Sequence, residues 1–374
     1  MVILNALGKQ NKIGPYEECP CGSNKKFKFC CYQKARQAKT ETDNKYLEYS
    51  DGRLQHEMNN IWESTDFKEC FAFDKENCNG VIKSAHSIQN NRILNKISDN
   101  GHVYSISHKI TKQGIVPELK KISKNKASTF FGFCDYHDTE LFKPIELNDY
   151  QNEPIQNFLF AFRAFAIEYH KKVRKLENAR NIFRMNPATL LMDDSIFFYR
   201  ISQLDVKDNE VEYNLFLNDY QTSNYNNIVT FFRRLDYGVK FAVSTSFVVK
   251  DDLNDMQIND IYSDKDEPLP SIYLNVYPID GGTNIIISYH KNYESIYKDY
   301  FEQINELNNE DLTSYLNFLI IEYTENVFFN PNYIMNLSEK EKESLLRSFQ
   351  SSIFVLDKFD LSEEENYFKF NLFS

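Results

Sequence analysis

The seven cysteines constrain the fold more than any other feature, because all of them fall in the first 134 residues of a 374-residue chain. Four are clustered and three are spread, at Cys19, Cys21, Cys30, Cys31, Cys70, Cys78 and Cys134. His137 follows the last cysteine closely. An odd count argues against a disulfide framework, whereas four thiolates, or three thiolates and an imidazole, are standard tetrahedral sets for zinc. The pattern predicts two Zn²⁺ sites that together use every cysteine.

The first group occupies a short run with a basic spacer, Cys19-Pro20-Cys21-Gly22-Ser23-Asn24-Lys25-Lys26-Phe27-Lys28-Phe29-Cys30-Cys31. Two thiolates one residue apart can approach a metal from an extended knuckle in which Gly22 allows the turn. A segment this short cannot fold on a core of its own. We therefore expect zinc binding, which provides roughly 10–16 kcal/mol in small zinc peptides, to supply its folding free energy.

This run resembles the SEC-C motif, C-P-C-G-S-x-K-K-[FY]-K-x-C-C, over about residues 15–34. The motif occurs at the C-terminal tail of the Sec preprotein translocase ATPase and in many stand-alone bacterial proteins. The resemblance implies a recognition module that docks a protein or ribosomal partner. Six basic side chains would line one face, or would only offset the charge of a four-thiolate zinc centre: Lys25, Lys26, Lys28, Lys34, Arg36 and Lys39.

The second predicted zinc site spans a longer segment and combines Cys70, Cys78, Cys134 and His137. Between its ligands we expect a hairpin, with Gly101 at a turn and an alternating strand over residues 102–107. After the ligands, residues 139–142 fit the first turn of a helix, with Asp138 as a candidate cap. A knuckle, a hairpin and a second knuckle that opens a helix follow the order of a treble-clef zinc fold.

Among treble clefs, this segment resembles the HNH nucleases, which place a catalytic histidine on a strand after the first knuckle. His86, in the run Ala85-His86-Ser87-Ile88, stands at that position. The resemblance implies that His86 is a general base that activates water for attack on a phosphodiester, with Mg²⁺ or Mn²⁺ at the leaving oxygen. Asn90 would then fill the role of the middle Asn, and Asp138 would be the remaining metal ligand.

Several positions depart from the HNH pattern. Ala85 stands where the family usually has Asp or His, the first knuckle is C-x7-C rather than C-x2-C, and the interval from His86 to His137 is longer than the compact motif. The residues leave two other interpretations of His86 open. It could be a zinc ligand in place of Cys70, or a structural histidine held by hydrogen bonds.

After about residue 150 the character of the chain changes. Apolar side chains at helical spacing from Ile155 to Tyr169 predict an amphipathic helix, after which His170 is expected to be exposed. Alternation predicts strands at 195–200, 211–217, 240–247, 272–277 and 283–289. The paired Gly281 and Gly282 predict a hairpin turn. Further helices are expected near 292–307, near 310–328, and from a capping box that begins at Ser338.

The predicted fold is α+β, with two zinc modules followed by an antiparallel sheet domain with helices. The predicted segments are a SEC-C zinc knuckle (1–40), a connector (41–67), a treble-clef-like zinc module (68–150) and an acidic α+β domain (151–374). The net charge is −11, but the front of the chain is basic and the rest is acidic, which suggests separate partners. The chain has neither a long uncharged apolar run nor a secretory signal, so we expect a cytoplasmic protein without a membrane partner.

Two functional hypotheses follow. In the first, the basic zinc half engages nucleic acid, and the HNH resemblance extends this to metal-dependent cleavage in a prokaryotic defence or toxin system, by analogy. In the second, the chain is a non-enzymatic adaptor. Its SEC-C module docks a protein or ribosome, while the acidic domain binds a second partner. Whether the chain is an enzyme separates the two hypotheses.

Overall fold

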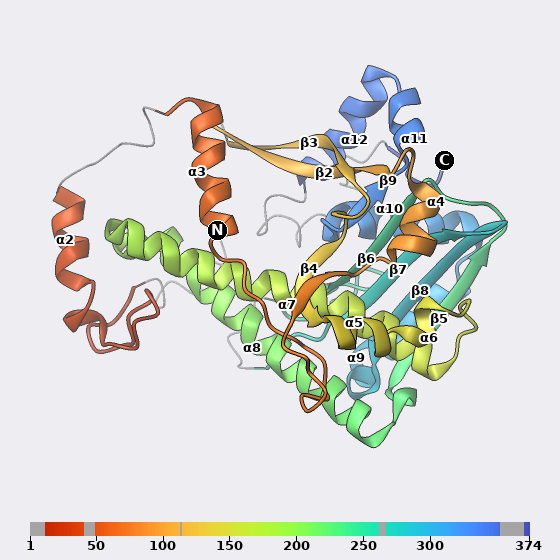
Figure 1. The fold of residues 1–374 in the computed structure, drawn as a ribbon, viewed down its shortest axis with the longest axis horizontal. Coiled ribbons are helices and arrows are strands. Elements are labelled where there is room, and N and C mark those ends of the chain that lie inside the picture. Colours follow the sequence, from red (N-terminus) through yellow and green to blue (C-terminus); the bar gives the residue numbers. More distant parts are fainter. Residues whose placement is uncertain (1–11, 41–48, 113, 262–266, 352–369) are drawn as a thin grey trace.

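The computed structural model describes residues 12–40, 49–112, 114–261, 267–351 and 370–374. It mixes helices with antiparallel strands, in agreement with the predicted α+β class. Seven strands form one sheet in the order β3-β2-β9-β6-β7-β8-β5 (Figure 1). Their bounds are β2 His102–Thr111, β3 Gly114–Ser123, β5 Ile228–Leu235, β6 Phe241–Phe247, β7 Ile272–Ile279, β8 Gly282–His290 and β9 Val327–Phe329. Separately, β1 (Ile82–His86) pairs with β4 (Thr129–Cys134).

Side chains of the central strands enter a different hydrophobic core on each face of the sheet. Phe241 and Val243 of β6 pack with the C-terminal helices, whereas Ala242 between them packs with α7. This follows from the alternation of side chains along a strand. The helices that contribute to the first of these cores are α9 Glu294–Glu306, α10 Asn309–Tyr323, α11 Pro331–Asn336 and α12 Glu339–Ser351. Every residue of β6 and β8, and all but the last of β7, is buried, so both faces of these strands are covered.

A long helical hairpin covers the other face of the sheet. Its elements are α7 Pro154–Met185, η4 Pro187–Leu191 and α8 Asp193–Thr222. The predicted amphipathic helix is confirmed, but α7 is longer than the pattern indicated, at 32 residues. At 1.5 Å per residue it spans about 48 Å. One end lies against the sheet and the other extends past it (Figure 1).

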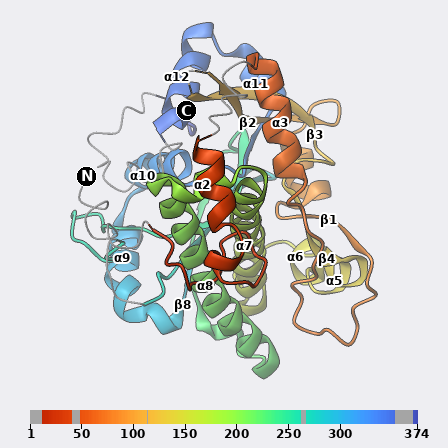
Figure 2. The same ribbon diagram turned by 90° about the vertical axis from the view of Figure 1, so that its left-hand side faces the viewer.

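The N-terminal segment packs on the far end of this hairpin. Its elements are η1 Phe27–Phe29 and α2 Tyr32–Thr40. Phe27 and Ala35 are buried in a small core with Leu176 and Phe183 of α7 and with Tyr199 of α8. Figure 2 shows α2 in front of the ends of α7 and α8. The first cysteine group is therefore held by the helical hairpin and lies away from the sheet.

Short elements complete the central region. Their bounds are α3 Asp51–Glu63, η3 Asn90–Leu94, α4 Asn95–Ile97, α5 Asp135–Glu140, α6 Lys143–Glu146, η5 Tyr225–Asn227 and η6 Lys291–Tyr293. α3 lies within the predicted connector, where it packs against β2 and α7. Among the residues that the structure describes, no helix has both the length and the apolar character to cross a membrane.

Two of the predicted strands are wrong, because 195–200 and 211–217 both belong to α8. The buried positions of this helix include Asn209, Glu212 and Asp219. These residues follow a helical spacing, but they are polar. A helix face that buries polar side chains gives no apolar period, and isolated apolar runs along it can resemble strands.

Most of the later predictions are confirmed. The strands over 240–247, 272–277 and 283–289 correspond to β6, β7 and β8, and Gly281 at the turn has φ +70°. The strand over 102–107 lies in β2. Gly101 lies in a turn just before this strand, with φ +72°, and β2 and β3 meet at the other end of the hairpin, where Thr111 pairs with Gly114. The capping box also forms, because the Ser338 N–H donates to the Glu341 carboxylate at 2.7 Å.

His170 is not exposed as predicted. Its side chain is 1% exposed, its ring stacks on Phe67 with centroids 4.3 Å apart, and its Nε2 lies 3.2 Å from the Phe67 carbonyl oxygen. The α7 face that carries His170 is covered by the segment before the second cysteine group. No pattern in the sequence indicated that this distant segment lies there.

The predicted boundary at residue 150 does not coincide with a break in the hydrophobic core. β2 pairs with β9, with Tyr104 opposite Phe329, so the sheet itself crosses the boundary. The Phe162 ring of α7 lies 5.9 Å from Phe133 of β4 and 5.3 Å from Phe216 of α8. The zinc segment and the sheet domain therefore share one core.

Replacement of Phe162 by Ala should destabilise both parts of the chain together. Phe162 is fully buried, and loss of a buried Phe ring typically costs about 3–5 kcal/mol. Chemical denaturation followed by intrinsic fluorescence would measure the loss. As the control, Phe198→Ala on α8 removes a ring that is 51% exposed and should change the unfolding free energy by less than about 0.5 kcal/mol. Equal effects of the two substitutions would contradict this account of the core.

Candidate metal centres

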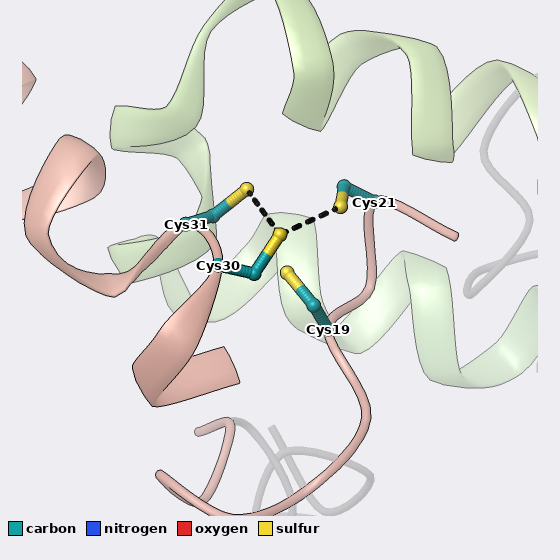
Figure 3. Close-up of side chains that lie close together, drawn as sticks. All are labelled: Cys19, Cys21, Cys30 and Cys31. Atoms are coloured by element: carbon teal, nitrogen blue, oxygen red, sulfur yellow. Dashed lines mark hydrogen bonds between the residues drawn. The ribbon is translucent and has the colours of Figure 1, made fainter. Parts of the chain in front are cut away.

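The four cysteines of the first group converge on one point (Figure 3). Their sulfur atoms all lie within 4.8 Å of one another. The Sγ atom of Cys30 is 3.6 Å from that of Cys21 and 3.7 Å from that of Cys31. Zn–S bonds of about 2.3 Å in a tetrahedron place neighbouring sulfurs about 3.8 Å apart. This group is therefore a candidate zinc site whose spacing already suits the ion.

Local backbone structure brings the two halves of this group together. The Cys19 N–H donates to the Lys25 carbonyl at 2.7 Å, and Gly22 turns the chain with φ +76°. Cys30 follows η1, and Cys31 directly precedes α2. This is the extended knuckle, basic spacer and returning pair that the sequence predicted.

Burial and hydrogen bonding give these thiols different pKa values. Burial raises the pKa of Cys19 to about 11 and raises that of Cys31 further. For Cys21, burial is outweighed by hydrogen bonds from Ser23 and the neighbouring thiols, which lower the pKa to about 7. Four thiolates so close together repel one another, so a divalent cation is needed to hold all of them deprotonated.

Ionic and polar contacts fix this centre to the helical hairpin. The Arg184 Nε–H of α7 donates to the Cys21 carbonyl oxygen at 2.7 Å. Arg200 of α8 forms an ion pair with Glu17. The metal group therefore keeps a fixed position at the end of the α7–α8 hairpin.

The second group also converges, and it brings together Cys70, Cys78, Cys134 and His137. The His137 Nδ1 atom lies 3.1 Å from the Cys134 sulfur and 3.4 Å from the Cys70 sulfur. The Cys134 N–H points at the Cys70 sulfur at 3.4 Å. All four donor atoms are within 4.8 Å of one another, so this is a second candidate zinc site. All eight predicted zinc ligands therefore lie in the two groups.

Secondary structure around the second group follows the predicted order, but the helix begins earlier than predicted: Cys134 is its N-cap, and the predicted cap Asp138 lies inside it. Cys134 ends β4 and stands just before α5, whose first turn carries His137. β1 pairs with β4 and places Ile82 opposite Cys134. Cys70 reaches the group because its segment runs beside β4, where the Phe71 N–H donates to the Gly132 carbonyl at 2.8 Å.

His86 lies at the end of β1 and belongs to neither cysteine group. The structure therefore brings Cys70, and not His86, to the second group. The His86 Nε2 atom is buried and has no hydrogen-bond partner among the described residues. Burial lowers the pKa of His86, and the nearby Arg163 guanidinium adds to this effect.

The other two predicted catalytic residues are separate from the zinc groups. Asn90 opens η3, and its Nδ2 donates to the Asn125 Oδ1 at 2.9 Å. Asp138 lies on α5, and one of its carboxylate oxygens is 3.8 Å from the Arg163 guanidinium. Within the described ranges, the donor atoms of His86 and Asp138 do not gather into a third metal-binding group.

Sequence reasoning missed Arg163 and Glu146. Arg163 is only 3% exposed, and it forms an ion pair with Glu146 at 2.5 Å. Its guanidinium also lies 4.1 Å from the centroid of the Phe142 ring. A buried charge requires a partner, so a lone arginine within the apolar run of α7 was a usable signal. The arginine links α7 to the elements that follow the second zinc group.

A small cavity lies between η3, α7 and the sheet. Its volume is about 10 Å³, which is room for a single water molecule. Arg163, Ser87 and Ser244 line it, and the Asn326 amide donates to the Ser87 hydroxyl at 2.9 Å. The cavity is too small for a substrate. The Asp138 and Glu146 side chains are each 32% exposed, so solvent reaches this region from their side.

No family model, no curated protein and no solved structure matches this chain.

Purified protein should contain two zinc ions per chain by elemental analysis. Each group should lose its ion independently, because the two share no ligand. Cys30→Ser and Cys134→Ser should therefore each reduce the content to one ion, since the thiolate is the ligand form. Ser23→Ala, which removes a neighbour of Cys30 but no ligand, should keep both ions. Wild-type protein with fewer than one ion per chain would contradict both sites.

Proposed function

We propose that this protein engages nucleic acid and hydrolyses phosphodiester bonds at His86, with two structural zinc ions that hold the site in shape. The observation that carries the proposal is the position of His86. It ends β1, beside β4 and α5, in the order that the HNH resemblance predicted. Its Nε2 atom is buried and has no hydrogen-bond partner among the described residues, so no protein group competes with a water molecule that enters to reach it.

The electrostatic surroundings of His86 suit a general base. Because burial and the Arg163 guanidinium lower its pKa, the imidazole is neutral at pH 7 and can take a proton from water. Asp138 and Glu146 are partly exposed and both lie beside the Arg163 guanidinium; they would supply the oxygen ligands that Mg²⁺ or Mn²⁺ prefers once the cation displaces that guanidinium. When bound, such a cation would stabilise the charge on the leaving oxygen.

Replacement of His86 by Ala should abolish Mg²⁺- or Mn²⁺-dependent cleavage of nucleic acid. Loss of a general base typically lowers the rate roughly 10²–10⁴-fold. Cleavage of plasmid DNA and of a labelled RNA would be measured beside zinc content, which should stay at the wild-type value. In a defence or toxin setting, the same substitution should relieve growth arrest on expression.

The matched control is His102→Ala, which removes an exposed histidine at the start of β2 and should leave cleavage unchanged. Wild-type protein that cleaves neither DNA nor RNA would refute the catalytic proposal. A His86→Ala variant that cleaves at the wild-type rate would also refute it.

A second candidate function is that of an adaptor, and an exposed patch on the first zinc segment favours it. Tyr16 is 62% exposed and Phe29 is 70% exposed. The Lys28 ammonium lies 5.2 Å from the centroid of the Tyr16 ring and 5.8 Å from that of Phe29. Exposed aromatic side chains beside cations are common in binding surfaces. The SEC-C resemblance supports a protein or ribosomal partner for this patch.

An adaptor should bind purified ribosomes through this patch and should cleave no nucleic acid. Lys25→Glu/Lys26→Glu places two negative charges beside the patch and should abolish co-sedimentation with ribosomes. The same change at Lys291 and Lys298, which are exposed on η6 and α9, should have no effect. Retention of ribosome binding by the first variant would exclude the patch as the docking site.

A further inference from the structure

The β2–β3 hairpin is an insertion in the strand pair that carries His86. β1 ends at His86, β4 begins at Thr129, and these two residues are paired across the strands. The whole hairpin lies between them in the sequence. It continues into the seven-stranded sheet, where β3 is the edge strand. Figure 1 shows it running from the sheet toward α3. The base of the hairpin, which is the end opposite its turn, therefore lies at His86.

The base of this hairpin carries a dense positive charge in an acidic protein. We define the basic segment as residues 120–126, Lys120-Lys121-Ile122-Ser123-Lys124-Asn125-Lys126. It has four lysines and no acidic residue, in a chain of net charge −11. No ion pair within the described part of the chain involves any of these four; the paired lysines lie elsewhere. Lys120, Lys121 and Lys126 are exposed.

Polar contacts place the basic segment beside His86. The Asn90 amide, just after the end of β1, donates to the Asn125 side chain at 2.9 Å. The Lys124 ammonium donates to the Asn95 side chain at 3.0 Å, and its backbone N–H donates to the Gly101 carbonyl at 2.9 Å. The lysines are therefore anchored to the same short elements that follow His86.

We infer that the basic segment binds the phosphodiester backbone of a nucleic acid and presents it to His86. This inference rests on the proposed function. Lysines on an edge strand also deter edge-to-edge association of sheets, which is the alternative explanation of this charge. A protein partner would need apolar anchors at the centre of its interface. The exposed large apolar side chains of the described residues include none between Ile115 and Tyr136.

The test measures binding separately from cleavage. All proteins carry His86→Ala, and the buffer contains no added divalent cation. Fluorescence anisotropy with a labelled 20-base-pair DNA duplex and with a labelled single-stranded RNA gives Kd across a range of KCl concentrations. The test variant is Lys120→Gln/Lys126→Gln. Its matched control is Lys291→Gln/Lys298→Gln, which removes the same charge on η6 and α9.

We expect the test variant to bind at least about tenfold more weakly near 0.1 M salt. A plot of log Kd against log salt concentration should also have a slope that is smaller by roughly 2, because each lost phosphate contact lowers this slope by about 0.9. The probe whose affinity falls more in the test variant, DNA or RNA, identifies the preferred nucleic acid. Unchanged affinity in the test variant, equal weakening in the control, or no binding of either probe by the parent would overturn the inference.

The two proposals can fail separately. Lysine-dependent binding without any cleavage by wild-type protein would refute catalysis at His86 and retain the basic segment as a binding surface. His86-dependent cleavage that is unaffected by Lys120→Gln/Lys126→Gln would refute the basic segment as the binding surface and retain catalysis at His86.

Discussion

Burial of the aromatic face of α7 is the interaction on which the described structure depends. Phe158, Phe162 and Phe165 are fully buried, and the helix contacts the sheet, α8 and the strands of the second zinc group. Burial of each ring stabilises the folded state by about 25 cal/mol for every Å² of apolar surface that is removed from water. Because a single helix face serves several partners, their relative positions are set together. Arg163 interrupts this face with a charge, and the ion pair with Glu146 compensates it.

The two candidate zinc centres occupy opposite ends of the same helix. The first is attached near Arg184 at the C-terminal end of α7, and the second packs through Phe133 against Phe162 near the N-terminal end. Both cysteine segments share their core with α7, so a metal ion bound at either group would stabilise the same folded state as the contacts with α7. The helix thereby separates the first cysteine group from the region around His86.

Local chemistry was predictable from the sequence, whereas long-range burial was not. Cysteine spacing identified both candidate metal groups, because thiolates have few other reasons to cluster in this way. Apolar alternation identified β6, β7 and β8. The same reasoning failed for α8, whose buried face carries Asn209 and Glu212, and for His170, which is covered by a segment distant in sequence. A pattern of hydrophobic residues cannot report a polar partner supplied by another part of the chain. Arg163 was the exception, since a charged side chain in an apolar run requires a polar partner.

The pairing of β2 with β9 has a consequence for dissecting the protein. A fragment that starts near residue 151 would retain β6 and β9 but lose the strand that covers the outer edge of β9. Exposed backbone donors and acceptors on such an edge recruit strands from other molecules. The aromatic face of α7 would lose its cover from the zinc segment at the same time. Dividing the chain at that point would therefore expose a surface suited to self-association.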